Sequence, residues 1–127
     1  MREQVQSDLF YIEIMIDRLS KIEEYTERFK KLGLNLQDEM VIDNLSFQLE
    51  QAGEQLSQNR ISEQTRTQFS HINWKDMKRF RNFISHSYVR KNNAVLMKIF
   101  QKDVPIYIEQ LYQVRNYLLR ELNKNNE

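Results

Sequence analysis

One segment of the sequence, residues 81–88, places a guanidinium, an imidazole and a phenol close together along the chain. The side chains concerned are Arg81, Asn82, His86 and Tyr88. An imidazole that titrates near neutral pH can accept and donate a proton, and a guanidinium can hold a phosphate through two parallel N–H bonds. Between residues 75 and 91 the chain has six basic side chains and one acidic side chain, a local charge of +5. The segment therefore predicts a site for an anionic ligand.

The spacing limits how these side chains could meet. On a helix, Asn82 and His86 are four residues apart and face the same way, so the Asn82 amide can orient the imidazole. Arg81 and His86 are five residues apart, which is outside ideal same-face contact. Both could reach one phosphate if the helix ends near Ser85 or if a second chain contributes, and we expect both. Tyr88 would line the site if the chain is extended there, and would face away if the helix continues.

Other residues nearby have simpler interpretations. An isolated histidine at a helix end usually bonds to a backbone carbonyl, but the surrounding cations favour a catalytic role for His86. For His71, which lies in a polar connecting segment, we expect a structural or solvent-exposed role. Trp74 is expected to anchor its helix in the core, with a stacking platform for a base as the alternative.

The helices that must position this segment are indicated by composition. A chain of 127 residues is expected to form a single domain over residues 1–127, and two glycines and one proline are too few for an all-β protein. The absence of cysteine excludes disulfides and thiolate metal sites, and two histidines are a poor metal-ligand set. The start of the sequence is charged, and no apolar run approaches the ~18 residues of a membrane span, so we expect a soluble, cytoplasmic protein.

Apolar spacing predicts an all-α protein, an antiparallel up-and-down bundle of four to five helices. The expected helices cover residues 3–31, a stretch starting between Asn35 and Asp38, a short piece capped by Ser62, residues 74–85, and a last helix starting near Asn93. Residues 1–73 carry a net charge of −5 and residues 74–127 carry +6, which predicts a positive face. The alternative is that charged helices merely solvate themselves.

Two helix-breaking residues lie inside predicted helices. Gly53 costs roughly 1 kcal/mol relative to alanine, so it indicates either a close approach of another helix or a tolerated surface glycine. Pro105 should either kink one long last helix or separate it from a new helix that starts after Asp103. We expect the kink.

The segment resembles the signature of the HepT toxins of the HEPN superfamily, which is an Arg, a polar residue, a His five positions after the Arg, and a Tyr two positions further on. Arg81, Asn82, His86 and Tyr88 match every position. Trp74, Gly53-Glu54 and Pro105 are also similar to that family's pattern, although the Gly-Glu element is a looser match and no function is assigned to it. The resemblance spans nearly the whole chain and implies an HEPN-like helical bundle.

The resemblance implies the toxin of a type VII toxin–antitoxin pair, an endoribonuclease that needs neither a metal nor another cofactor. The ribose 2′-OH would attack the adjacent phosphorus while His86 moves the proton and Arg81 holds the negative oxygens. Only RNA has this hydroxyl. Asn82 would orient His86 or the phosphate. The residues expected to bind RNA phosphates independently of sequence are Lys78, Arg79 and Arg90.

The resemblance also implies two protein partners. One is a second copy of the chain, in a homodimer whose Arg81–His86 segments face each other across a groove. The other is an MntA-like nucleotidyltransferase antitoxin that transfers AMP to Tyr88. The alternative function is a non-catalytic helical subunit that binds such a nucleotidyltransferase, and RNA cleavage by the purified chain alone would separate the two.

Overall fold

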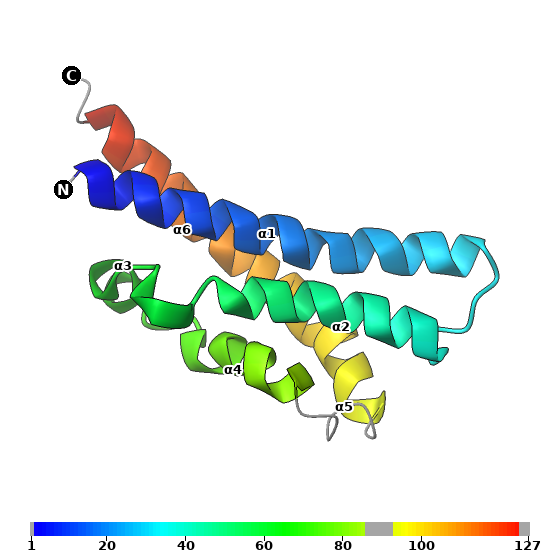
Figure 1. Ribbon diagram of the computed structural model, residues 1–127. Coiled ribbons are helices and arrows are strands. Elements are labelled where there is room, and N and C mark those ends of the chain that lie inside the picture. The colour runs from blue at the N-terminus through cyan, green and yellow to red at the C-terminus, as the bar shows by residue number, and fades with distance from the viewer. Residues whose placement is uncertain (1, 86–92, 125–127) are drawn as a thin grey trace.

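The computed structural model describes residues 2–85 and 93–124, with the backbone alone for residues 82–85. Within these ranges every regular element is helical, which confirms the all-α prediction (Figure 1). The α-helices are α1 (Arg2–Lys31), α2 (Glu39–Glu54), α3 (Glu63–Gln68), α4 (Trp74–Ser85), α5 (Asn93–Lys98) and α6 (Val104–Lys124). A 3-10 turn, η1 (Ser57–Asn59), follows α2, and a π-helical segment, η3 (Ile99–Asp103), joins α5 to α6. No helix in the described ranges is both long and apolar enough to cross a bilayer.

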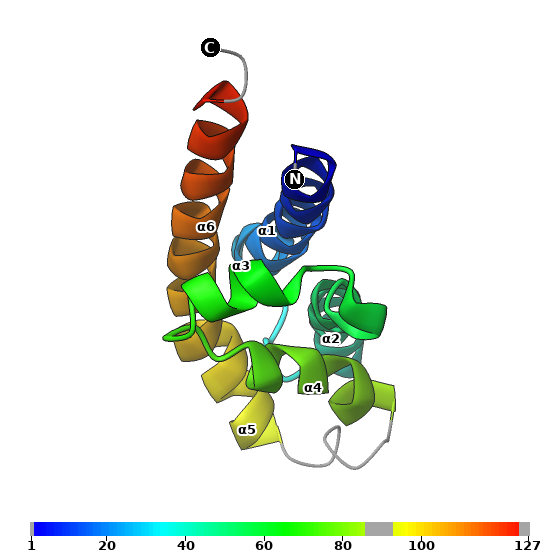
Figure 2. The same ribbon diagram turned by 90° about the vertical axis from the view of Figure 1, so that its left-hand side faces the viewer.

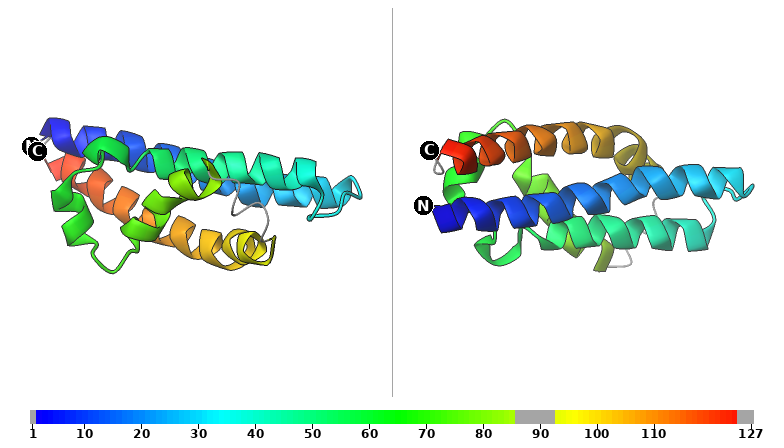
Figure 3. Two further views of the ribbon diagram at one scale, coloured as in Figure 1. Left: turned by 60° about the horizontal axis from the view of Figure 1, so that its bottom comes forward. Right: turned by 90° about the horizontal axis from the view of Figure 1, so that it is seen from above.

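The long helices form the predicted antiparallel bundle. α1 lies between α2 and α6 and packs along both (Figure 3). α6 runs back to the start of α1, where Arg2 Nη1 donates to the carbonyl of Leu122 at 3.1 Å. α4 packs against α2 on the side away from α1 (Figure 2). α4 contains the start of the predicted site segment. It is therefore an outer helix that is held mainly by α2.

The core is built from apolar side chains three or four residues apart on each helix. On α1 the buried stripe comprises Ile12, Met15, Ile16, Leu19 and Ile22, none of which is more than 6% exposed. Leu45 and Leu49 of α2 and Leu111 and Leu118 of α6 complete the same cluster. Because burying one such side chain contributes about 1.5–3 kcal/mol, this stripe determines which face of each helix points inward.

The turn between α1 and α2 follows from two local signals. Gly33 has a positive φ of 77°, its N–H donates to Lys30, and the next N–H donates to Phe29, which is the helix-ending pattern that glycine favours. Asp38 then caps α2 by accepting from the N–H of Met40 at 2.8 Å. The short connection makes the two helices antiparallel, as predicted.

A buried carboxylate that the sequence analysis did not single out holds α3 in place. Asp8 on α1 is only 2% exposed, and its oxygens accept from the N–H of Ser62 at 2.9 Å, the Ser62 hydroxyl at 2.6 Å and the Thr65 hydroxyl at 2.6 Å. The same Ser62 hydroxyl caps α3 by accepting from the N–H of Thr65, as predicted. One charged group thus ties the start of α3 to α1, 54 residues away.

The last helix continues through Pro105 without a break. Proline has no N–H, and its ring obstructs the carbonyl four residues earlier. Immediately before it, the chain takes a π-helical turn in which the Val104 N–H donates to Ile99, five residues back. α5, η3 and α6 (Val104–Lys124) therefore follow one another without a gap, and the irregularity before Pro105 is a π-helical insertion. The kink stays a prediction.

Candidate active site

α4 is oriented by its first turn. Asn73 caps the helix by accepting from the N–H of Asp76 at 3.1 Å, and the Trp74 indole N–H donates to the carbonyl of Phe69 at 3.0 Å. Trp74 is half-buried and packs against the core, which agrees with the anchoring role, and its other side lines the α3–α4 cleft, so the stacking role stays a prediction. Met77 and Phe80 point into the core at 1% and 5% exposure. These contacts fix the rotation of α4 about its axis and leave the next positions exposed.

Gly53 allows α4 to approach α2 closely. A Cβ at Gly53 would lie 2.7 Å from the carbonyl oxygen of Met77, 3.0 Å from the backbone nitrogen of Arg81 and 3.2 Å from Cβ of Phe80. All three atoms belong to α4, and two are backbone atoms that cannot rotate away. The close-approach explanation of this glycine is therefore confirmed, and the crossing point lies beside Arg81.

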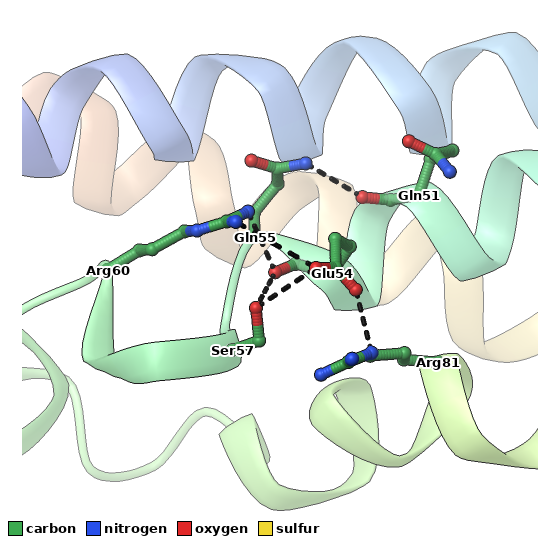
Figure 4. A network of polar contacts seen from close by, with 6 residues as sticks. All are labelled: Gln51, Glu54, Gln55, Ser57, Arg60 and Arg81. Atoms are coloured by element: carbon green, nitrogen blue, oxygen red, sulfur yellow. Dashed lines mark hydrogen bonds and ion pairs between the residues drawn. The ribbon is translucent and has the colours of Figure 1, made fainter.

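Glu54, the residue after Gly53, holds Arg81 at this crossing. Its Oε2 lies 2.8 Å from Nε of Arg81 (Figure 4). The other oxygen, Oε1, accepts from the Ser57 hydroxyl at 3.2 Å and lies 3.8 Å from Nη2 of Arg60. The side chains of Arg81 and Glu54 are 49% and 30% exposed, so solvent weakens the pair and its contribution to stability is at most about 1 kcal/mol. Its main effect is to orient the guanidinium, because a carboxylate held by further donors restricts its partner.

The arrangement places an oriented, exposed arginine on α4 five positions before the predicted catalytic histidine. A scan against protein-family models matches residues 15–114 to the family described as Ribonuclease HepT-like. The chain belongs to the HepT-like ribonuclease family. Searches of curated proteins and of solved structures found no match.

Several predicted members of the HepT-like site lie outside the part of the chain that the structure describes. These are His86, Tyr88 and Arg90. The backbone of Asn82 lies in the last turn of α4, but its side chain is not described. The roles of these four residues stay predictions, and Arg81 is the member of the motif whose surroundings are shown.

The two described cations predicted to bind RNA phosphates lie on different flanks of α4. Lys78 is exposed and lines a cleft between α3 and α4, three residues before Arg81. Arg79 lies beside α5 and α6, where it pairs with Asp76 at 3.7 Å. Adjacent helical residues are separated by 100°, so both cannot follow the same strand closely. His71 is exposed, its ring 6.2 Å from that of Phe69, which agrees with a non-catalytic role.

Sequence reasoning missed the role of Glu54. The only signal was the similarity of Gly53-Glu54 to the family pattern, to which no function was assigned. In the structure both residues act at the same helix crossing. Gly53 lets α2 pack closely against α4, and Glu54 contacts Arg81 across this crossing.

Proposed function

We propose that this HepT-like chain is a metal-independent endoribonuclease and the toxin of a type VII toxin–antitoxin pair. The observation that carries the proposal is Arg81, an exposed guanidinium that Glu54 holds at 2.8 Å in a chain of a ribonuclease family. A guanidinium fixed by its Nε presents a planar, permanently charged group, which suits the oxygens of a phosphodiester.

The reaction is an attack of the ribose 2′-OH on the adjacent phosphorus. The O2′–P bond forms, the P–O5′ bond breaks, and the products are a 2′,3′-cyclic phosphate and a 5′-hydroxyl. Arg81 stabilises the negative charge that develops on the phosphate oxygens, and His86 moves the proton. Asn82 orients His86 or the phosphate. The nucleophile is the 2′-OH of the ribose next to the scissile phosphate, so no metal-bound water is needed.

The direct test is cleavage of total RNA by the purified chain in chelator. We expect Arg81→Ala and His86→Ala each to lower the cleavage rate by roughly 10²–10⁴-fold while circular dichroism remains helical. His71→Ala and Arg115→Ala are matched controls, since His71 is exposed elsewhere and Arg115 forms a comparable pair with Glu13 through Nε at 3.4 Å. Both controls should cut RNA normally.

The test has two informative failures. If a His86→Ala protein cuts RNA at the parental rate, the assignment of the nuclease activity to this motif is wrong. A parent chain that leaves RNA intact would favour the alternative function, a helical subunit that binds a nucleotidyltransferase without cutting RNA itself.

Regulation by AMP transfer to Tyr88 is the second part of the proposal. An adenylyl group on Tyr88 would add a phosphodiester charge and an adenosine seven residues after Arg81. In the proposed site, this anion would compete with substrate phosphate for the guanidinium. Tyr88→Phe should remain a competent nuclease and escape neutralisation when a cognate nucleotidyltransferase is co-expressed. Mass spectrometry of the peptide that contains Tyr88 measures the modification directly. An unmodified peptide from a neutralised complex would show that inhibition works by binding alone.

The toxin is proposed to act as a homodimer. The first and last long helices expose large apolar side chains that a partner would cover, namely Phe10 at 60%, Tyr112 at 44% and Ile106 at 55%. We expect Tyr112→Glu to weaken the dimer in light scattering. Met40→Glu is the control, because Met40 is also exposed, at 78%, but lies on α2. A stable monomer of the parent at micromolar concentration would contradict the dimer.

A further inference from the structure

A cleft of about 560 Å³ lies between α3 and α4, and its lining reaches Lys78, three residues before Arg81 on α4. Its volume falls within the ~300–1,000 Å³ of pockets that bind small ligands. Three cations and one carboxylate line it, together with two hydroxyl groups. These residues are Arg66, Lys75, Lys78, Glu63, Thr67 and Ser70.

The cations of the cleft lead away from Arg81. Lys75, Lys78 and Arg81 follow one another at intervals of three residues on α4, which gives axial steps of about 4.5 Å and puts consecutive members on neighbouring faces. Lys75 and Lys78 are exposed, and Arg66 approaches the same cleft from α3. The positive charges therefore form a track from Arg81 into the cleft.

Beyond Arg81, which pairs with Glu54, the lysines of this track have no carboxylate partner among the described residues. In the described part of the chain, no acidic group lies within ion-pair distance of Lys75 or Lys78. Arg66 is held by neutral acceptors, with Nε donating to the Ile61 carbonyl at 3.1 Å and Nη2 to Asn59 Oδ1 at 3.4 Å. These bonds position the guanidinium and leave its charge uncompensated.

The opposite flank of α4 has two cations against the three of the cleft, and each of the two is paired with a carboxylate. There Arg79 pairs with Asp76 at 3.7 Å, and Lys98 on α5 pairs with Asp103 at 3.5 Å. These four groups sum to zero charge, whereas the four charged groups of the α3–α4 cleft sum to +2. An anionic strand that leaves Arg81 gains more by following the cleft.

We propose that the α3–α4 cleft is a phosphate-binding subsite for single-stranded RNA, and that the strand on one side of the scissile phosphate runs from Arg81 over Lys78 and Lys75 to Arg66. This inference rests on the proposed ribonuclease function. It adds Lys75 and Arg66 to the RNA-binding residues, and it leaves Arg79 outside the path. The hydroxyls of Thr67 and Ser70 supply further donors to phosphate oxygens or to the ribose.

The test measures binding of a 5′-labelled single-stranded RNA to His86→Ala protein by fluorescence anisotropy across a salt series. In that background we compare Lys75→Gln/Lys78→Gln with Lys98→Gln/Lys102→Gln, which removes the same two charges from exposed positions on the α5–η3 flank. Losing two phosphate contacts should reduce the slope of log K against log salt by about 1.4, which corresponds to roughly 25-fold weaker binding at about 0.1 M salt. The Lys98/Lys102 variant should bind within about threefold of its parent and keep its slope, because a distant charge contributes only a screened term.

Arg66→Gln is the third arm, read together with its urea denaturation curve because Arg66 also bonds within the α3 region. It should weaken RNA binding while the protein remains folded at the assay temperature. If the two double-lysine variants bind RNA equally well, whether or not both have lost affinity, the strand path is wrong. RNA cleavage by the parent chain would still support the ribonuclease function in that case. A parent that neither cleaves nor binds RNA would overturn both.

Discussion

Gly53→Ala tests whether the close crossing of α2 and α4 determines the position of Arg81. The new Cβ would lie 2.7 Å from the Met77 carbonyl oxygen and 3.0 Å from the Arg81 nitrogen. Ordinary contacts of this kind are longer by roughly half an ångström, so the helices must move apart by about that much. Overpacking costs about 1–3 kcal/mol, and alanine recovers about 1 kcal/mol through its better helix propensity. The expected net loss in the free energy of unfolding is about 1 kcal/mol.

The effect on catalysis should exceed the effect on stability. A shift of about 1 Å in a positioned group can lower a rate by roughly 10²-fold, so a displacement of half that size should lower kcat by about tenfold. A domain stable by about 5 kcal/mol stays more than 99% folded after losing 1 kcal/mol. The lost activity therefore cannot come from unfolded protein. Urea denaturation gives the first quantity, and the initial rate of oligonucleotide cleavage gives the second.

Gly33→Ala is the matched control for this experiment. Gly33 has a φ of 77° and open space around the position of a Cβ, so alanine there costs about 1–2 kcal/mol of backbone strain without touching α4. It should destabilise the protein to a similar extent and leave kcat unchanged. If Gly33→Ala loses activity in proportion to stability, or if Gly53→Ala cuts RNA at the parental rate, the crossing does not set the geometry of Arg81.

Three further outcomes are expected. Glu54→Gln should lower kcat about tenfold with little change in KM or in the free energy of unfolding, because it frees the Arg81 guanidinium from a partly exposed pair; steady-state cleavage kinetics and urea denaturation check it. Asp8→Ala should lower the free energy of unfolding by about 3 kcal/mol, measured by urea denaturation, since it leaves one buried and two partly buried donors without their acceptor. Burial, with help from nearby carboxylates, raises the pKa of Tyr107 from 10.0 to about 12. The folded state then keeps a proton that the unfolded state loses, so stability should fall by about 2 kcal/mol between pH 10 and 12, and Tyr107→Phe should reduce that fall in denaturation curves.

Local features of the fold could be predicted because their causes are local. The stripe on α1, the glycine stop at Gly33, the Asp38 and Ser62 caps and the bounds of α4 each depend on residues within a few positions of one another. Pro105 predicted a disturbance in the last helix, but not that a π-helical turn would accommodate it. The choice depends on how the flanking turns pack, which spacing alone does not contain.

Contacts between helices were harder to predict. Glu54 and Arg81 are 27 residues apart, and Asp8 and Ser62 are 54 apart, so both pairs depend on the axial and rotational register of packed helices. Lys78 and Arg79 were both predicted to bind RNA phosphates, without a distinction between them. The packing of Met77 and Phe80 fixes the rotation of α4 and places them on separate flanks.

The network around Arg81 keeps a positive charge at the site while restraining it. Glu54 contributes one negative charge against Arg60 and Arg81, so the three groups together carry +1. Arg60 lies farther from the carboxylate, at 3.8 Å against 2.8 Å, and is further held by the Glu54 carbonyl at 3.3 Å. A glutamate paired with Arg81 alone would cancel the charge that attracts RNA. Because Arg60 shares the carboxylate, Glu54 can orient Arg81 and the site still favours an anion, which joins the geometry of the α2–α4 crossing to the electrostatics of the proposed reaction.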